Sequence, residues 1–422
     1  MPTDRSRRKP LPWGAGDVWL LMKDRPRCSG RSHMASVAGH TAPVAVHITT
    51  RRGPRGRLRR RLAGVVILVA LLVVLPSVVV GGAGAGATSA TGKKRVAFID
   101  QKVSFKAGGV TVYATFRHPT SGRSVPGVLL IAGSGPTDRN GNNANVPGTI
   151  GNLKALAYWL SADGVASLRY DKLGSGKTGL GFYALDPDAI GITPYEQEAA
   201  AALTFLGAEK GVESSRLGVI GHSEGALFAL LLATGHAGPV PPIHALGLLE
   251  PLSQPYLTLI ANQFHATLAA ERAQGKISAA KEAKAEATLA STIAQMRATG
   301  TVQGYPPYGI GEELNPTSAT FLSQTDRFDP AAVAAQLPRG MPVLVTCSNA
   351  DVQITCGEVA RLKRGLKQAH ADVDAIHLHN VDHVLKVDPS GSPDDYALPL
   401  PFSRQLKAAL ATFVQRNLVR KS

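Results

Sequence analysis

The stretch Leu-Gly-Val-Ile-Gly-His-Ser-Glu-Gly-Ala (217–226) decides the predicted fold of this chain. The apolar run that ends at Ile220 is typical of a short buried strand, and the apolar residues after Gly225 predict a helix. Gly221 and Gly225 flank Ser223, so strand and helix can approach closely around a tight turn. A serine at such a junction is exposed at the edge of a sheet, which makes Ser223 the candidate nucleophile.

Short apolar runs alternate with helical stretches on both sides of this turn. The predicted strands are residues 96–99, 110–116, 127–131, 165–170, 217–220, 245–249, 342–345 and 373–379, of which the first two are expected to form a hairpin. The predicted helices of the core are residues 153–162, 194–206, 226–234, 359–370 and 402–418. Strands that are apolar almost throughout are typical of a parallel sheet covered on both faces. The pattern predicts a mostly parallel, doubly wound α/β sheet.

The alternation is interrupted between residues 252 and 340. Two Ala-rich stretches, 257–272 and 277–298, carry apolar residues at helical spacing and predict an inserted pair of helices. We expect this insertion to be a lid, while a solvated helical hairpin without such a role is the alternative. The aromatic and glycine-rich turn around 305–308 has features expected where a substrate enters.

Residues 1–90 differ from the rest of the chain in charge and composition. The whole sequence has a net charge of +16, and residues 1–62 contribute +12 of it, with 15 Lys and Arg against 3 Asp and Glu. A basic surface that binds nucleic acid is therefore not expected of the folded part. Residues 1–61 are predicted to be a basic, disordered leader, and the α/β core is predicted to comprise residues 91–251 and 341–422.

The segment 62–90 has the organisation of an export signal. An apolar run at 62–80 follows a cluster of arginines and precedes small residues, and Ala-Gly-Ala (85–87) fits a small-x-small cleavage site. If it is not cleaved, the run is just long enough to contact and span a membrane as an anchor. In either case the basic flank predicts that the chain after residue 90 is exported, secreted or anchored on the outer face of the cytoplasmic membrane. A buried core helix is the alternative.

A serine hydroxyl becomes a good nucleophile only beside a base, and that base needs an acid that orients it. The acid candidate is Asp351, which follows the predicted strand 342–345 and would lie at the carboxyl edge of the sheet. The base candidate is His383, in the loop after the next strand. The order Ser223, Asp351, His383 along the chain is one of the orders known for such a triad.

Both assignments have alternatives. Asp351 could be a solvated loop carboxylate, and Asp382 is a weaker candidate for the acid because it adjoins the histidine in sequence. His377 and His379 share one face of the predicted strand, and His383 could join them at a metal site. No Asp or Glu motif nearby completes a zinc site, so neither a metal nor a cofactor is expected.

The stretch Leu-Leu-Ile-Ala-Gly-Ser-Gly-Pro (129–136) predicts an oxyanion hole. It ends a strand in a glycine-rich bend, where the backbone N–H of Ser134 can point at a developing negative oxygen, and the N–H of Glu224 would be the second donor. A single donor of this kind is typically worth about 3 to 4 kcal/mol of barrier. A plain tight turn or a phosphate cradle is the alternative, but the stretch matches neither usual phosphate-binding pattern.

Several of these motifs together resemble one family. Gly-Ser-Gly-Pro-Thr-Asp-Arg-Asn-Gly (133–141), the segment 169–177, Gly-His-Ser-Glu-Gly (221–225), Asp351 and Asp-His-Val (382–384) are similar to bacterial exported α/β-hydrolases, which group with esterases, lipases and serine aminopeptidases. The resemblance covers roughly residues 95–250 and 341–418 and does not extend to the predicted lid. It implies the α/β-hydrolase fold, a triad of Ser223, Asp351 and His383, and an oxyanion hole at Ser134 and Glu224.

Two positions depart from that family. Ala132 stands where many of its members have histidine, and Leu173 stands where arginine usually follows Asp-Lys (171–172). Neither change removes a catalytic group. The second leaves open which residues pair with Asp171.

Cys347 and Cys356 lie on either side of Asp351. Outside the cytoplasm they are expected to form a disulfide, which would constrain the unfolded chain by roughly 2.5 kcal/mol and hold the loop of the acid. Two unpaired thiols are the alternative.

Taken together, the sequence predicts a serine hydrolase that cleaves carboxylic ester bonds of a small-molecule or lipid substrate through an acyl-enzyme. A serine aminopeptidase or thioesterase of the same fold is one alternative, because peptides and thioesters undergo the same acyl chemistry. A catalytically silent, surface-tethered binding protein is the other. The sequence makes no prediction of oligomeric state.

Overall fold

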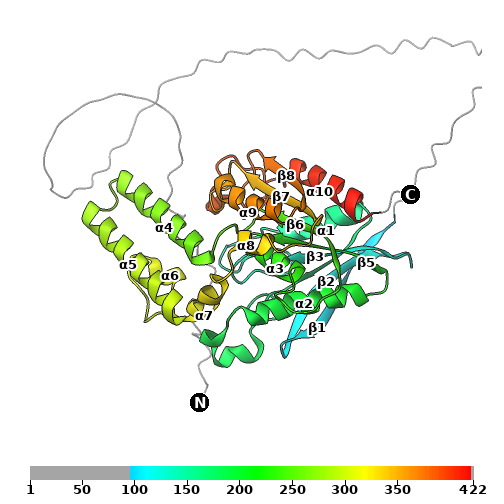
Figure 1. Cartoon of the computed structure of the whole chain (residues 1–422), viewed down its shortest axis with the longest axis horizontal. Helices are drawn as coiled ribbons and strands as arrows, with labels where there is room; N and C mark the ends of the chain where they lie inside the picture. The colour runs from blue at the N-terminus through cyan, green and yellow to red at the C-terminus, as the bar shows by residue number, and fades with distance from the viewer. Residues whose placement is uncertain (1–95, 420–422) are drawn as a thin grey trace, which may run out of the picture. The chain divides into compact units, whose positions relative to one another are not determined.

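The computed structural model describes residues 96–419, and a mostly parallel sheet of eight strands runs through them (Figure 1). The strands are β1 (Phe98–Ala107), β2 (Val110–Pro119), β3 (Val125–Ile131), β4 (Ala166–Tyr170), β5 (Val212–His222), β6 (Ile243–Leu249), β7 (Pro342–Ser348) and β8 (Asp372–Leu378). They lie in the order β1-β2-β4-β3-β5-β6-β7-β8. β2 is antiparallel to both of its neighbours, and all other neighbouring pairs are parallel. The predicted α/β sheet is confirmed.

Helices connect the strands. The α-helices are α1 (Asn152–Ala162), α2 (Thr193–Ala208), α3 (Glu224–Ala233), α4 (Tyr256–Ala273), α5 (Ala279–Thr299), α6 (Ile310–Glu313), α7 (Pro316–Thr325), α8 (Pro330–Ala334), α9 (Cys356–Gln368) and α10 (Arg404–Asn417). Short 3-10 helices are η2 (Gly181–Leu185), η3 (Pro187–Ala189) and η4 (Pro393–Asp395). The five helices predicted for the core are confirmed with small shifts at their ends.

Two apolar layers cover the two faces of the sheet. On one face, α1 and α10 pack against inward-pointing residues of the strands, with Leu156 and Phe413 among the buried side chains. On the other face, α2, α3 and α9 form the larger layer, in which α3 is buried along almost its whole length. Burial on both faces explains why the central strands are apolar throughout.

The first strand differs from its prediction. The chain was expected to form a strand at 96–99, whereas β1 spans Phe98–Ala107 and pairs with β2 along its whole length. Polar residues alternate with Val103 and Phe105 in β1, because this strand lies at the edge of the sheet and only one of its faces packs against the core.

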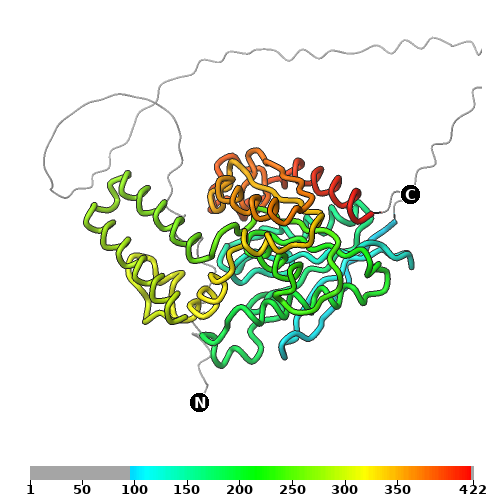
Figure 2. Tube along the Cα trace, in the orientation of Figure 1, coloured from blue at the N-terminus to red at the C-terminus, as the bar shows by residue number. Residues whose placement is uncertain are grey.

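Five helices, α4 to α8, lie between β6 and β7, and Figure 2 traces them in yellow-green to yellow. The two long predicted helices are confirmed as α4 and α5, and the three short helices were not predicted. Residues Leu257, Ile260 and Phe264 of α4 are buried in the same apolar layer as α2 and α3. The insertion is packed onto the core through the first half of α4 and also through α8, which lies against α3 and α9 and adds Val333 and Ala334 to that layer.

The predicted leader and the predicted signal or anchor segment, residues 1–90, lie outside the described residues. Between residues 96 and 419, no helix combines the length and the apolar character needed to cross a membrane.

Candidate active site

Ser223 occupies a strained turn between β5 and α3. Its φ is 54° and its ψ is −121°, a conformation that costs a residue with a side chain about 1 to 3 kcal/mol. Backbone hydrogen bonds hold this conformation. The N–H of Ser223 donates to the carbonyl of Leu249 at 2.9 Å, and the carbonyl of Ser223 accepts from Leu252 at 3.1 Å. The structure thus places Ser223 in the strained turn expected from its sequence context.

The two glycines of the turn leave no room for a side chain. A Cβ atom on Gly221 would lie 2.1 Å from the carbonyl oxygen of Gly225, and one on Gly225 would lie 2.4 Å from the carbonyl oxygen of Ile131. Strand β3, strand β5 and helix α3 therefore meet here at backbone contact, which is the close approach that the glycine spacing predicts.

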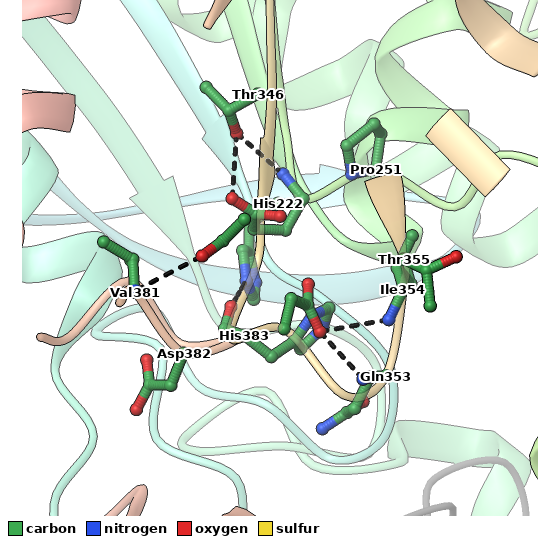
Figure 3. A network of polar contacts seen from close by, with 12 residues as sticks. His222, Pro251, Thr346, Gln353, Ile354, Thr355, Val381, Asp382 and His383 are labelled. Carbon is green, nitrogen blue, oxygen red and sulfur yellow. Dashed lines mark hydrogen bonds and ion pairs between the residues drawn. The ribbon is translucent and has the colours of Figure 1, made fainter. Parts of the chain in front are cut away.

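His383 is hydrogen-bonded to Asp351. The imidazole Nδ1 lies 2.8 Å from Oδ2 of Asp351, and both side chains are buried. The other carboxylate oxygen accepts the N–H groups of Gln353 at 2.8 Å and Ile354 at 3.0 Å (Figure 3). Burial alone would raise the pKa of Asp351, but His383 and these two donors outweigh it and hold that pKa below its usual value.

Asp382 is not the partner of the histidine. Its carboxylate points away from the ring of His383 (Figure 3) and accepts the backbone N–H of Lys386 at 2.7 Å. Burial raises the pKa of Asp382 to about 7. Of the two aspartates considered for the acid, the structure brings only Asp351 to the imidazole.

Ser223 and His383 line one small pocket, together with Gly133, Ser134 and His222. Ser223 and Ser134 also line an adjoining pocket, to which Glu224 contributes. Glu224 is the first residue of α3, so its backbone N–H is one of the helix N–H groups that have no partner within the helix. The structure therefore gathers the five predicted catalytic and oxyanion-hole residues, Ser223, Asp351, His383, Ser134 and Glu224, around the turn that carries Ser223.

The insertion contributes to the walls of this site. Tyr256, Leu259 and Gln263 of α4 line the pocket shared with Ser223, and Leu252 lies just before them in the chain. Thr317 and Phe321 of α7 line a further pocket that reaches Glu224. The turn at 305–308, expected near the substrate entrance, contributes to neither pocket.

A buried lysine, which the sequence analysis did not assign, lies behind the predicted oxyanion hole. The ammonium of Lys172 donates to the carbonyl of Gly133 at 2.6 Å and to the carboxylate of Glu224 at 2.9 Å. The hydroxyl of Tyr256 donates to the other oxygen of the same carboxylate at 3.0 Å. The side chains of all three polar residues are almost completely buried.

His222 was also missed, although it directly precedes the candidate nucleophile. Its Nε2 lies 2.7 Å from the backbone carbonyl of His383. Burial, together with the nearby imidazole of His383, lowers the pKa of His222 to about 3. His222 is therefore neutral at physiological pH, and its Nε2–H donates to that carbonyl and holds the backbone of His383.

Glu250, at the carboxyl end of β6, is a second buried acid beside Asp351. Its φ is 44°, its side chain is fully buried, and it accepts a hydrogen bond from the hydroxyl of Thr346 at 3.3 Å. Burial and the adjacent carboxylate of Asp351 raise the pKa of Glu250 well above its usual value. Of these two buried acids, Glu250 is therefore the one that favours the neutral form and Asp351 the one that favours the ionised form. The position of Glu250 directly after a predicted strand is the signal that could have found it.

The structure answers the question left open for Asp171. Arg139 approaches this carboxylate with two nitrogens, at 2.9 Å and 2.6 Å, and the backbone N–H groups of Arg139 and Lys177 also donate to it. These contacts outweigh burial and lower the pKa of Asp171. Arg139 belongs to the glycine-rich segment 133–141, so Asp171 anchors that segment to the end of β4 without an arginine at residue 173.

His377 and His379, the other two histidines considered for a metal site, do not line the pockets at Ser223. The rings of His377 and His379 stack with centroids 4.9 Å apart, and His377 lines a separate pocket beside the cysteines. Within residues 96–419, no group of three or more His, Cys, Asp or Glu side chains is arranged to hold a metal ion.

Cys347 and Cys356 form a disulfide, with Cα atoms 5.1 Å apart, that links the end of β7 to the start of α9 across the loop of Asp351.

Several solved structures of known proteins are similar to this chain at low sequence identity. No protein-family model and no curated protein matches the chain. Acylaminoacyl peptidase from Pyrococcus horikoshii is similar at 15% identity and a TM-score of 0.48, over 77% of this chain and 42% of that one. Est1E from Butyrivibrio proteoclasticus, with ferulic acid bound, has 15% identity and a TM-score of 0.46, over 75% and 100%. An esterase from Pyrococcus furiosus has 14% identity and a TM-score of 0.45, over 76% and 92%. This chain thus spans less than half of the peptidase.

The fold itself can be identified from the sheet and the turn. The second strand is antiparallel to its neighbours, six strands run parallel from β4 to β8, and the buried crossover helices cover both faces. Ser223 lies on a glycine-flanked strand–turn–helix at the carboxyl edge of the sheet. The chain is an α/β-hydrolase-fold protein.

Proposed function

We propose that this protein is a serine hydrolase that cleaves carboxylic ester bonds with Ser223, His383 and Asp351 as its triad. One observation carries the proposal. The imidazole of His383 is held 2.8 Å from the carboxylate of Asp351 in the same pocket as the strained Ser223. A hydroxyl, a base and an acid that fixes the base are the groups that nucleophilic acyl transfer requires.

In the proposed reaction, Nε2 of His383 accepts the proton of the Ser223 hydroxyl as Oγ attacks the ester carbonyl. The carbonyl π electrons move to oxygen, and the backbone N–H groups of Ser134 and Glu224 stabilise this oxyanion. The imidazolium then gives its proton to the leaving alcohol, and the acyl group remains on Oγ. Water repeats the sequence with His383 as base, which releases the acid and restores the serine.

Asp351 and His222 would keep the base in place. Hydrogen bonding of Nδ1–H to Asp351 leaves Nε2 free for the serine proton and stabilises the imidazolium. The hydrogen bond from Nε2–H of His222 to the backbone carbonyl of His383 fixes the main chain of the same residue.

The inserted helices would act as a lid that shapes the acyl site. Leu252, Leu259 and Ile354 give the pocket next to Ser223 an apolar part, which suits the hydrocarbon part of an acyl group, and Gln263 and Gln353 line it with uncharged amides. This favours an ester of an apolar acid over a charged substrate. Peptides and thioesters remain the alternative substrates because their carbonyl chemistry is the same.

Export of the enzyme is part of the proposal. A disulfide beside the site suits an oxidising compartment outside the cytoplasm. The small-molecule or lipid ester would then be met outside the cell or at the outer face of the membrane.

A fluorophosphonate probe tests the proposal because it reacts only with an activated serine. Wild-type protein should be labelled, and Ser223→Ala should not be labelled although it keeps the same thermal unfolding midpoint. A series of p-nitrophenyl esters of increasing chain length, alongside aminoacyl p-nitroanilides and acyl thioesters, would then identify the substrate class. Absence of labelling in folded wild-type protein would favour the silent binding protein.

A further inference from the structure

The position of Lys172 calls for an explanation. Its side chain is 4% exposed, and burying an ammonium costs several kcal/mol unless the charge is paired and hydrogen-bonded. The pairing is with Glu224, which is 2% exposed, at 2.9 Å. A pair of apolar residues would fill the same space without that cost, so the charge has no evident packing role.

The hydrogen bond from Lys172 to the carbonyl of Gly133 affects the backbone N–H of the next residue, Ser134. The carbonyl of Gly133 and the N–H of Ser134 belong to one planar peptide group and point in opposite directions. A hydrogen bond of 2.6 Å from the Lys172 ammonium to that carbonyl therefore fixes the direction of the Ser134 N–H. The positive charge on the oxygen side also polarises the peptide group and makes its N–H a stronger donor.

The second hydrogen bond of Lys172 is to Glu224, whose backbone N–H is the other predicted donor of the oxyanion hole. Glu224 supplies the second backbone N–H, and its side chain is held by Lys172 on one oxygen and by Tyr256 on the other. One buried ammonium is thus hydrogen-bonded to the peptide group that carries the N–H of Ser134 and to the side chain of Glu224.

We propose that Lys172 is the positioning residue of the oxyanion hole, whose ammonium orients the N–H groups of Ser134 and Glu224 toward the substrate oxygen at Ser223. The proposal rests on the proposed function, because an oxyanion forms only if Ser223 attacks a carbonyl. Tyr256 extends the arrangement into the insertion, since it is the first residue of α4 and its hydroxyl completes the hydrogen bonding of Glu224.

A purely structural role for the lysine predicts a different result from a positioning role. Thionoesters carry sulfur where the oxyanion would form, and sulfur is a larger and weaker acceptor, so a well-oriented oxyanion hole favours the oxygen ester. The ratio of kcat/KM for an oxygen ester to that for its thionoester therefore reports on the hole. Lost stability alone does not move this ratio.

The test compares Lys172→Met, and Lys172→Met combined with Glu224→Gln, with wild type. We expect kcat for the oxygen ester to fall about 10- to 100-fold, KM to stay within about twofold, and the oxygen-to-thionoester ratio to fall about tenfold, because an oxyanion donor acts on the transition state. The double variant removes both buried charges and keeps the test open if the single variant does not fold. If neither folds, Tyr256→Phe deletes one hydrogen bond of the same group and should lower the ratio by a smaller factor.

Lys386→Met is the matched control. This lysine is also buried, and its ammonium donates to the backbone carbonyls of Tyr396 and Leu398, neither of which lines the pockets at Ser223. The Lys386→Met variant should be less stable than wild type but keep the wild-type ratio of kcat/KM for the oxygen ester to that for the thionoester.

The outcomes separate the two proposals. Folded variants at Lys172 with an unchanged ratio would overturn the positioning role and leave the hydrolase proposal standing. Wild-type protein that is neither labelled by fluorophosphonate nor active on either ester would overturn the hydrolase proposal, and the role of Lys172 would fall with it.

Discussion

The imidazole Nδ1 of His383 lies 2.8 Å from the carboxylate of Asp351, although 32 residues separate them in the chain. This contact requires the tautomer that leaves Nε2 free of a proton. Asp351→Asn keeps the shape of the side chain, but its amide N–H can donate to Nδ1 of His383. This favours the tautomer that carries its proton on Nε2. We expect kcat to fall on the order of 10⁴-fold with little change in the unfolding midpoint.

Asp382→Asn is the control for that measurement, because Asp382 adjoins the histidine but faces away from it. Its esterase activity should stay within about threefold of wild type, as for changes outside catalytic contacts. An equally large loss of kcat in both variants would mean that activity does not depend on the hydrogen bond between Asp351 and His383.

Gly225→Ala should disrupt the turn at Ser223. The new methyl group would lie 2.4 Å from the carbonyl oxygen of Ile131, so β3 and α3 must separate. We expect a loss of at least about 1 to 3 kcal/mol in the free energy of unfolding, measured by urea titration, and loss of fluorophosphonate labelling. Gly357→Ala in α9 is the control, since its nearest neighbour would be 3.6 Å away, and this variant should be as stable as wild type or slightly more stable.

Removal of the disulfide should loosen the loop of Asp351. Cys347→Ser combined with Cys356→Ser releases a loop with a sequence separation of 9, which corresponds to roughly 2.5 kcal/mol of the free energy of unfolding on the entropic model. Dithiothreitol should lower the midpoint of wild type toward that of the double variant and leave the double variant unchanged. A reductant effect of the same size on both proteins would contradict this assignment.

Glu198 should make stability depend on pH. Its side chain is buried in α2, and burial raises its pKa from 4.5 to about 8, so the folded protein keeps a proton that the unfolded chain releases. This contribution to stability is fully present below about pH 4.5 and is lost as the pH rises through about 8, with a slope of at most about 1.4 kcal/mol per pH unit.

Glu198→Gln carries no such proton. Its free energy of unfolding relative to wild type should therefore rise between pH 5 and pH 8 and then level off, as measured by denaturant titration at each pH. A flat difference for Glu198→Gln would show that this carboxyl is ionised in the folded protein.

The central strands and the turn at Ser223 could be predicted because their pattern is local. An apolar run, two glycines and a following helix specify the turn without knowledge of distant residues. β1 was placed only in part, because its edge position gives it alternating residues in place of a continuous apolar run. The short helices α6 and α8 were missed because four or five residues give too few turns for a periodic pattern.

The supporting residues of the site could not be predicted in the same way. Lys172 contacts Gly133 and Glu224, which lie 39 and 52 residues away in the chain. Its role depends on burial and on the sheet order, which bring these segments together. His222 and Glu250 were visible at the ends of predicted strands, but only their contacts with the histidine loop and with Asp351 distinguish them from ordinary core residues.

The hydroxyl of Tyr256, the first residue of α4 in the inserted segment, is bound by Glu224, the residue directly after Ser223. Exchange of the whole insertion for that of another hydrolase is an obvious route to new specificity. A graft that does not keep a tyrosine at residue 256 would leave a carboxylate oxygen of Glu224 without this donor. Engineers who replace the segment should therefore join the new sequence after residue 256.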